Sequence, residues 1–184
     1  DAFKEMGVSI KEEGSNILIK GKGLSSLKKA SKNLYLGNSG TSTRLLTGLL
    51  ASQKFNSILT GDKSLSSRPM RRIIDPLNKM GADINSQDGK LPLVIKGNDL
   101  KSTNLEIKIA SAQIKSGLIL AALNTQGITN IIENSVTRNH TEIMLETFGA
   151  DIETKRNGSK TEIKINGKKE LKPKNISVPS DLSS

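Results

Sequence analysis

Hydrophobic and polar positions follow one pattern three times along the chain of 184 residues. In each copy an amphipathic stretch ends at a Met-Gly or Phe-Gly step, and a short strand, a polar turn with glycine and an alternating strand come after it. Glycine adopts positive φ at the end of a helix without steric cost, and alternation of apolar and polar residues is typical of a half-buried strand. Each copy therefore predicts a helix that leads into a β-hairpin. The three segments are residues 6–21, 80–97 and 148–167.

A further alternating strand is expected after each hairpin, and it runs directly into small and hydroxyl residues that are typical of a helix start. Strongly apolar helices follow at 45–51 and 117–123, and a strand and an amphipathic helix then lead to the next glycine step. The repeating unit is therefore β-α-β-α-β-β. Its second helix should start near Ser66 or Ser67, with Pro69 at an early helical position. The strands expected after the hairpins are 33–36, 105–109 and 175–178, and those after the apolar helices are 57–60 and 129–132.

The phase of the repeat predicts how the chain is organised. The chain opens inside a helix that should end at Gly7, and it closes at Ser184, just as a third helix should begin. We therefore expect residues 1–184 to form a single domain of α/β (α+β) class that is truncated at both ends. Chance similarity among three hairpins is the alternative explanation of the pattern.

The content of cysteine and histidine limits the chemistry. The chain has no cysteine and one histidine, which excludes disulfides and thiolate metal sites and disfavours a histidine-based metal site. No run approaches the roughly 18 apolar residues needed to span a membrane, and no signal peptide opens the chain. These features predict a soluble, cytoplasmic protein without a metal or a membrane partner.

The charge balance of the chain indicates the kind of partner that it binds. Lys and Arg number 28 and Asp and Glu 18, which gives a net charge of +10. This excess favours an anionic partner, whether nucleic acid, a membrane surface or a phosphorylated metabolite. The aromatic content of 2% disfavours nucleic acid, because single-strand binders stack bases on aromatic side chains. A compositional bias toward Lys, Asn, Ile and Ser is the alternative source of the charge.

Three predicted helix starts are candidate sites for an anion, because a helix N-terminus offers unpaired N–H groups and a partial positive charge. In the first segment two glycines and several hydroxyl residues precede Arg44. In the second, Arg68 stands beside the helix start and is suited to grip a phosphate or carboxylate bidentately. In the third, Ser111 and Gln113 begin an almost entirely apolar helix. The segments are residues 36–44, 61–72 and 110–116.

Each segment also has a purely structural explanation. One Ser or Thr is enough to cap a helix, and a solvated basic face accounts for Arg71 or Arg72. Gln113 needs hydrogen-bond partners, which either backbone or ligand supplies. His140 is explained as a solvent-facing residue in the first turn of another helix. Because no paired carboxylates, Ser/His/Asp arrangement or phosphate-binding glycine fingerprint occurs, the residues alone predict anion binding without catalysis.

Four ordered motifs resemble the 5-enolpyruvylshikimate-3-phosphate synthase (EPSP synthase) family. They are LGNSGTSTRLL at 36–46, GDKSLSSRPMRRIIDPLNKMGA at 61–82, SAQIKSGLILAAL at 111–123 and TRNHTEIMLETFGA at 137–150. Ser39, Leu45 and Ala112 differ from the Ala, Pro and Ser of one class and resemble the second bacterial class. These departures leave the response to the herbicide glyphosate open.

The resemblance implies both a fold and a reaction. Each of two domains would be an inside-out, barrel-like assembly of three β-α-β-α-β-β units whose helix N-termini face an interdomain cleft. The family's enzyme, 3-phosphoshikimate 1-carboxyvinyltransferase, transfers the enolpyruvyl group of phosphoenolpyruvate to the 5-hydroxyl of shikimate 3-phosphate in aromatic amino-acid biosynthesis. It uses no metal or organic cofactor. The chain would be the substrate-binding domain of a monomeric enzyme, and its partner would be the second domain of the same enzyme.

The resemblance also assigns roles to residues of this sequence. Gln113 would sit between the two substrates, and Asn38 and Arg44 would hold the shape of the first loop. No catalytic residue is assigned, because the family's proton donor and acceptor fall outside the chain, and the isolated chain is expected to bind substrate weakly and to be inactive. The residues assigned to phosphoenolpyruvate are Gly40, Thr41 and Arg68. Those assigned to shikimate 3-phosphate are Ser111, Ala112 through its backbone, Thr137 and Arg138.

Three other interpretations remain open. An enolpyruvyl transferase acting on UDP-N-acetylglucosamine shares the fold, but its loop usually carries a cysteine where this chain has residues 63–65. A basic nucleic-acid-binding module predicts binding that weakens steeply with salt. A noncatalytic scaffold predicts that substitution of Arg68 or Gln113 has no effect on the intact protein.

Overall fold

The computed structural model describes residues 1–178 and contains two four-stranded sheets of identical topology. The first comprises β3 (Leu34–Tyr35), β4 (Ser57–Thr60), β5 (Asp83–Gln87) and β6 (Lys90–Lys96). The second comprises β7 (Asn104–Ile107), β8 (Ile128–Glu133), β9 (Ile152–Asn157) and β10 (Lys160–Asn166). Their strand orders are β3-β4-β6-β5 and β7-β8-β10-β9, with the first pair parallel and the others antiparallel. The predicted α/β repeat is confirmed.

Helices provide the connections that these sheets require. A parallel strand pair needs a crossover, which α2 (Gly40–Ala51) supplies between β3 and β4 and α5 (Ala112–Leu123) supplies between β7 and β8. After the crossover, α4 (Arg71–Lys79) and α6 (His140–Thr147) lead into the hairpins. Gly81 and Gly149 follow these helices with φ of 92° and 78°, which confirms the predicted helix ends.

The first copy of the pattern, residues 6–21, forms only a two-stranded hairpin. Helix α1 (Ala2–Glu5) precedes β1 (Ser9–Glu13) and β2 (Asn16–Lys20), which pair antiparallel as a two-stranded sheet. Its position in the repeat is that of β5-β6 and β9-β10, whose second strand pairs with a further strand at its other edge. Here the side chains of Ile17 and Ile19 stay 65% and 61% exposed.

Two predictions about elements were wrong. The second helix of the first unit is divided into α3 (Lys63–Ser67) and α4, so Ser66 and Ser67 end a helix instead of starting one. Asp62 caps α3, and Arg68, which precedes Pro69, is extended at φ −76° and ψ 138° because proline disfavours helical geometry in the residue before it.

The other wrong prediction concerns residues 175–178, which form no strand. The corresponding strands β3 and β7 each pair in parallel with the strand that follows the next helix. No such partner follows among the described residues, and Val178 is 85% exposed. The helix start predicted at 179–184 lies outside the described residues.

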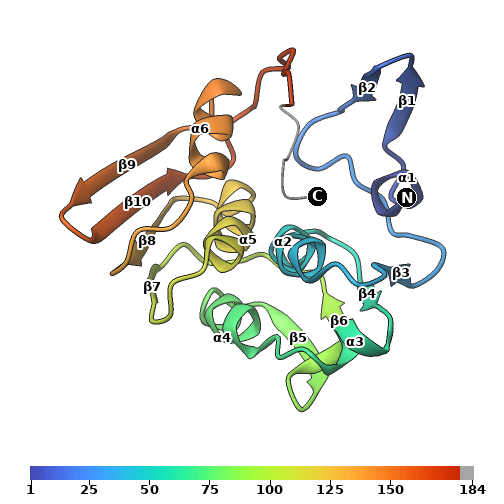
Figure 1. Ribbon diagram of the computed structural model, residues 1–184, viewed down its shortest axis with the longest axis horizontal. Coiled ribbons are helices and arrows are strands. Elements are labelled where there is room, and N and C mark those ends of the chain that lie inside the picture. The colour runs from blue at the N-terminus through green and yellow to red at the C-terminus, as the bar shows by residue number, and fades with distance from the viewer. Residues whose placement is uncertain (179–184) are drawn as a thin grey trace.

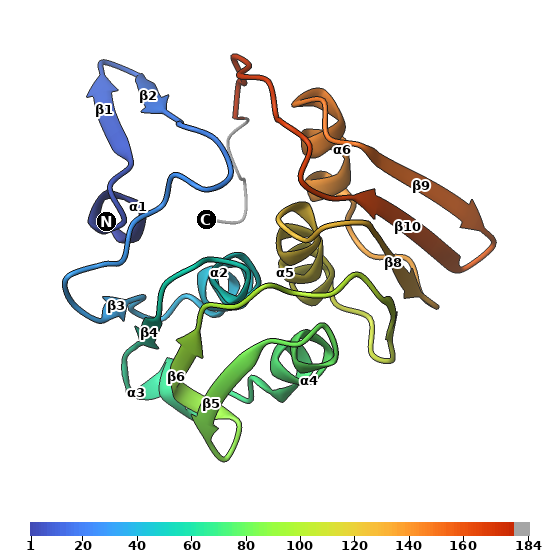
Figure 2. The ribbon, with the colours of Figure 1, turned by 180° about the vertical axis from the view of Figure 1, so that it is seen from behind.

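The core is centred on α2 and α5, which lie side by side between the two sheets in both views of the ribbon (Figures 1 and 2). Two glycines face each other at their crossing. A Cβ on Gly48 would lie 1.8 Å from the carbonyl oxygen of Gly117, and a Cβ on Gly117 would lie 2.7 Å from the carbonyl oxygen of Arg44. The helix backbones therefore touch directly, which brings the starts of α2 and α5 close together.

Candidate anion-binding site at the helix starts

The start of α2 is shaped by its cap. Ser39 Oγ accepts a hydrogen bond of 3.1 Å from the backbone N–H of Ser42, which satisfies one of the free donors of the helix start. Gly37 precedes it with φ of 57°, a conformation that favours glycine, and its carbonyl accepts the N–H of Asp62 at 2.9 Å. The first two predicted segments are thereby joined.

Asn38 links those segments through its side chain. Its Nδ2 donates to Asp62 Oδ2 at 3.0 Å, and its Oδ1 accepts a hydrogen bond from Arg68 Nη2. Asp62 in turn accepts the backbone N–H of Leu65 at 2.7 Å as the cap of α3. The guanidinium of Arg68 is thus tied to the loop that begins α2.

Gly40 lies under two guanidinium groups. A Cβ at this position would be 2.8 Å from Arg44 Nη1 and 3.1 Å from Arg68 Nη1. Because both contacts are closer than ordinary packing allows, glycine lets the two cations converge over the first turn of α2.

Arg44 joins α2 to α5. Its Nη1 donates to Gln113 Oε1 at 2.8 Å, and Gln113 Nε2 donates to Thr41 Oγ1 at 2.8 Å. Burial lowers the pKa of Arg44, and the nearby guanidiniums of Arg68 and Arg72 lower it further. A guanidinium keeps its proton at neutral pH even so, and the group of three positive charges favours an anion.

The start of α5 is also capped by a serine side chain. Ser111 Oγ accepts the backbone N–H of Ile114 at 3.4 Å, and both Ser111 and Ala112 are partly exposed. A hydroxyl that caps a helix through a lone pair keeps its own proton, so the Ser111 side chain is able to donate to an anion.

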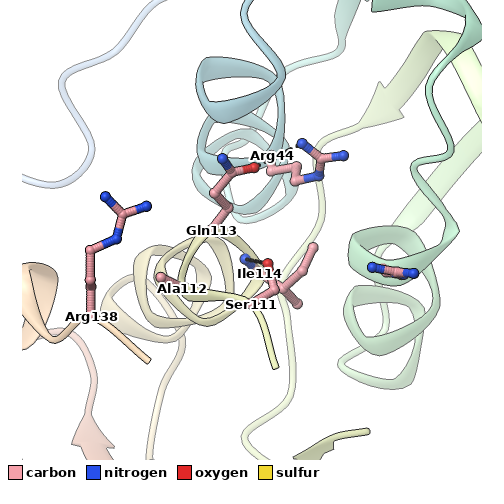
Figure 3. A pocket seen from close by; sticks show the side chains of 7 residues that line it. Arg44, Ser111, Ala112, Gln113, Ile114 and Arg138 are labelled. Atoms are coloured by element: carbon pink, nitrogen blue, oxygen red, sulfur yellow. Dashed lines mark hydrogen bonds between the residues drawn. The ribbon is translucent and has the colours of Figure 1, made fainter. Parts of the chain in front are cut away.

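A pocket of about 360 Å³ lies at the start of α5, with Arg44 of α2 at its edge (Figure 3). In Figure 3 Gln113 and Arg44 point toward each other from α5 and α2, and Arg138 approaches from the segment before α6. Three arginines line the pocket, and no carboxylate of the described chain does. The electrostatic character of the pocket is therefore that of an anion site. The lining residues are Arg44, Arg72, Ser111, Ala112, Gln113, Ile114 and Arg138.

Most of the residues predicted from the sequence are in or beside this pocket. Gly40 and Thr41 adjoin it through Arg44 and Gln113, and Arg68 lies at Gly40. Thr137 is different, because its hydroxyl donates to the buried Glu133 at 2.8 Å. Those that line the pocket itself are Arg44, Ser111, Ala112, Gln113 and Arg138.

Arg72 was missed as an individual site residue. The sequence offered the Arg71-Arg72 doublet but no reason to prefer either, because the choice depends on where α4 begins. Since the helix starts at Arg71, Arg72 faces the pocket, while the stem of Arg71 packs over Gly89, where a Cβ would meet its Cγ at 2.3 Å.

Two further features concern the described part of the chain. No helix among residues 1–178 has the length and apolar character to cross a membrane. Within the same residues, His, Asp and Glu side chains do not gather in threes as a potential metal site.

The fold and the pocket together define a class of α/β protein in which repeated units bring helix starts to one anion-attracting site. The sequence matches, over residues 1–184, the family described as EPSP synthase (3-phosphoshikimate 1-carboxyvinyltransferase). The chain belongs to this family. The matches favour it over the enolpyruvyl transferase acting on UDP-N-acetylglucosamine and over a nucleic-acid-binding module.

Individual relatives agree in sequence and in structure. The chain is 50% identical to the 3-phosphoshikimate 1-carboxyvinyltransferase of Oceanobacillus iheyensis, over 100% of the chain and 42% of that protein. It is 51% identical to that of Magnetococcus marinus, over 99% of the chain and 41% of the protein. EPSP synthase from Acinetobacter baumannii superposes with a TM-score of 0.91 at 47% identity, covering 99% of this chain and 41% of that one. The chain thus spans about two fifths of the length of these relatives.

Proposed function

We propose that the protein catalyses the reaction for which its relatives are named, the transfer of an enolpyruvyl group from phosphoenolpyruvate to the 5-hydroxyl of shikimate 3-phosphate, with release of phosphate. The observation that carries this proposal is the pocket that three arginines line without any carboxylate of the described chain. Both substrates carry phosphate and carboxylate groups, which the planar fork of arginine binds bidentately.

The two helix starts divide the substrates between them in this proposal. At α5, Ser111 donates its free hydroxyl proton to the phosphate of shikimate 3-phosphate, with the backbone at Ala112 and the guanidinium of Arg138 beside it. The N-terminal partial charge of α5 adds to this attraction because the helix is long enough to have a substantial dipole.

Phosphoenolpyruvate takes the neighbouring position at the start of α2. Gly40 leaves its backbone open to the ligand, with Thr41 beside it, while Arg68 binds the charged groups. Asn38 and Arg44 hold these groups in place, since each is engaged in hydrogen bonds to another part of the site. One N–H of the Gln113 amide donates to Thr41 Oγ1, and the other is free to donate to a substrate between the two helix starts.

The pocket of this chain contains groups that bind anions but none suited to proton transfer. No Asp, Glu, Lys or His of the described chain lines the pocket, and an arginine is a poor acid or base at neutral pH. We propose that a second domain of the enzyme supplies the proton donor and acceptor and closes over the pocket. The isolated chain is then expected to bind weakly and not to turn over.

Ligand titration of the chain tests the binding part. Amide shifts at Ser111, Gln113 and Arg138 are expected when shikimate 3-phosphate is added to ¹⁵N-labelled chain. Shikimate without its phosphate is the matched control and should leave these amides in place. Equal shifts from both ligands, or shifts confined to other elements, would contradict the proposed site.

A chimera tests the catalytic part. In it the chain replaces the matching two fifths of the Acinetobacter baumannii EPSP synthase, and phosphate release from the two substrates is measured. The chimera should turn over, and Arg68→Gln within it should lower kcat/KM by about tenfold or more, as expected for one lost charge-assisted contact. A folded chimera without activity would count against the proposal.

Two further properties belong to the proposal. We expect the complete protein to be monomeric and cytoplasmic, with no nucleic acid or membrane as partner. Sedimentation equilibrium and cell fractionation test these statements, and an oligomer or a membrane-associated fraction would contradict them.

A further inference from the structure

A buried ion cluster lies behind the pocket and has no part in the chemistry described above. Lys115 of α5 is 1% exposed, and its Nζ lies 3.0 Å from Glu133 Oε1 and 2.8 Å from Glu142 Oε1. Both carboxylates are buried as well. One ammonium thus faces two carboxylates in the interior, an arrangement that is costly to desolvate.

The two carboxylates flank the segment that carries Arg138. Glu133 is the last residue of β8, and Glu142 lies in the first turn of α6. The segment 134–139 connects these two elements, and it carries Arg138 into the pocket. Lys115 therefore contacts the chain immediately before and shortly after the segment that positions Arg138.

A third contact holds the segment from within. Thr137 Oγ1 donates to Glu133 Oε2 at 2.8 Å, and the Thr137 backbone N–H points to Glu133 Oε1 at 3.5 Å. Because the Thr137 hydroxyl proton is committed to Glu133, this side chain offers a ligand only its lone pairs, which suit no phosphate oxygen. The hydroxyl thus serves the loop in this arrangement.

The second carboxylate is bound less completely. Glu142 Oε1 lies at ion-pair distance from Lys115 without the geometry of a hydrogen bond, and neither Glu142 oxygen has a hydrogen-bond donor within the described chain. Its place in the first turn of α6 lets the helix N-terminus offset part of its charge. Beside it, Ser116 Oγ and Thr141 Oγ1 meet at 2.6 Å and join α5 to α6.

Stability alone does not explain such a cluster, because well-packed apolar residues of similar size usually stabilise a core at least as well. We propose that Lys115, Glu133 and Thr137 act as positioning residues that fix the segment 134–139, so that Arg138 faces an anion at the start of α5. The proposal depends on the proposed function only for the identity of the anion. The order of the segment is open to measurement without any ligand.

Two substitutions, Thr137→Val and Thr137→Ser, test the proposal, and each changes the volume of the side chain only slightly. Thr137→Val removes the hydroxyl and should make the amide of residue 137, which points to Glu133 Oε1, exchange with solvent about tenfold faster, as expected when the hydrogen bond that holds it in place is lost. Thr137→Ser keeps the hydroxyl and should restore the wild-type exchange rate. Amides at the centre of β8 should be unaffected in both variants.

Anion binding gives a second readout, with inorganic phosphate as the probe. Thr137→Val should raise the Kd for phosphate about threefold to tenfold at low ionic strength, and Thr137→Ser should return it to the wild-type value. Glu146→Gln, on the exposed face of α6, is the matched control for Glu133→Gln, and only the latter should weaken binding.

The possible results decide the proposal in either direction. If the exchange of the residue 137 amide and the phosphate affinity are the same in Thr137→Val as in wild type, the segment is not held in this way and the proposal is overturned. The same holds if exchange accelerates equally throughout the chain, because the role is then general stability. Faster exchange at residue 137 supports the proposal even where shikimate 3-phosphate fails to bind, so the two proposals fail separately.

Discussion

Arg44 of α2 donates to Gln113 of α5 at 2.8 Å, one helical turn from the point where Gly48 and Gly117 meet. The spacing follows from the helix repeat, because residues four apart lie on the same face. The close glycine crossing therefore sets the separation at which the arginine and the glutamine reach each other. Core packing and site geometry are coupled across these two helices.

Gly48→Ala should disturb both together. Its Cβ would lie 1.8 Å from a backbone oxygen that cannot rotate away, so α2 and α5 must separate. We expect a loss of about 1–3 kcal/mol in the free energy of unfolding by urea, reduced somewhat by the better helix propensity of alanine. Gly21→Ala is the control, since nothing lies within 4 Å of that Cβ. An unchanged midpoint for Gly48→Ala would show that the crossing is looser than described.

Gly40→Ala should affect binding more than stability. The new methyl would stand 2.8 Å from Arg44 Nη1 and 3.1 Å from Arg68 Nη1, and these flexible side chains move more easily than backbone. We expect the Kd for phosphate, measured by calorimetry, to rise about tenfold, because two charge-assisted contacts lose their geometry. The free energy of unfolding should change by less than about 1 kcal/mol. If the variant binds phosphate with the wild-type Kd, Gly40 has no role in the site.

Arg72→Gln and Arg71→Gln form a matched pair from one helix turn. Arg72 lines the pocket, whereas Arg71 packs over the turn at Gly89. Loss of Arg72 should weaken phosphate binding about fivefold to tenfold and make it less dependent on salt, because one of the clustered cations is gone. Arg71→Gln should leave affinity nearly unchanged. An equal loss of phosphate affinity in both variants would mean that binding depends on the net charge of the chain and not on the position of Arg72.

Gln113→Glu tests the sign of the potential in the pocket. The carboxylate accepts from Arg44 as the amide does, and although it cannot donate to Thr41 as Nε2 does, the Thr41 hydroxyl is able to donate to it instead. The free energy of unfolding should therefore change by less than about 1 kcal/mol. A negative charge beside three arginines should nevertheless lower phosphate affinity about tenfold or more, which an NMR titration measures. Unchanged affinity would contradict the description of this pocket as an anion site, because a carboxylate among its arginines must oppose the binding of phosphate.

The repeat is predictable from the amino-acid sequence, because its strands and helix ends depend on local conformational preferences. Alternating apolar residues specify strands, and glycines such as Gly81 and Gly149 end helices at positive φ. The motifs around Arg44, Arg68 and Gln113 are equally local, so they indicate the helix starts without reference to the fold. The division of the second helix at Arg68 was missed, since the effect of Pro69 on the residue before it competes with an otherwise helical pattern.

Which side chains meet depends on how the helices and sheets pack against each other. That Gln113 bonds to Thr41 and Arg44 depends on the crossing of two helices about 70 residues apart in sequence. The choice of Arg72 over Arg71 depends on the rotation of α4, and the engagement of Thr137 by Glu133 depends on how β8 and α6 enclose Lys115. Long-range packing sets these relationships, and no periodicity along the chain encodes a distance between elements.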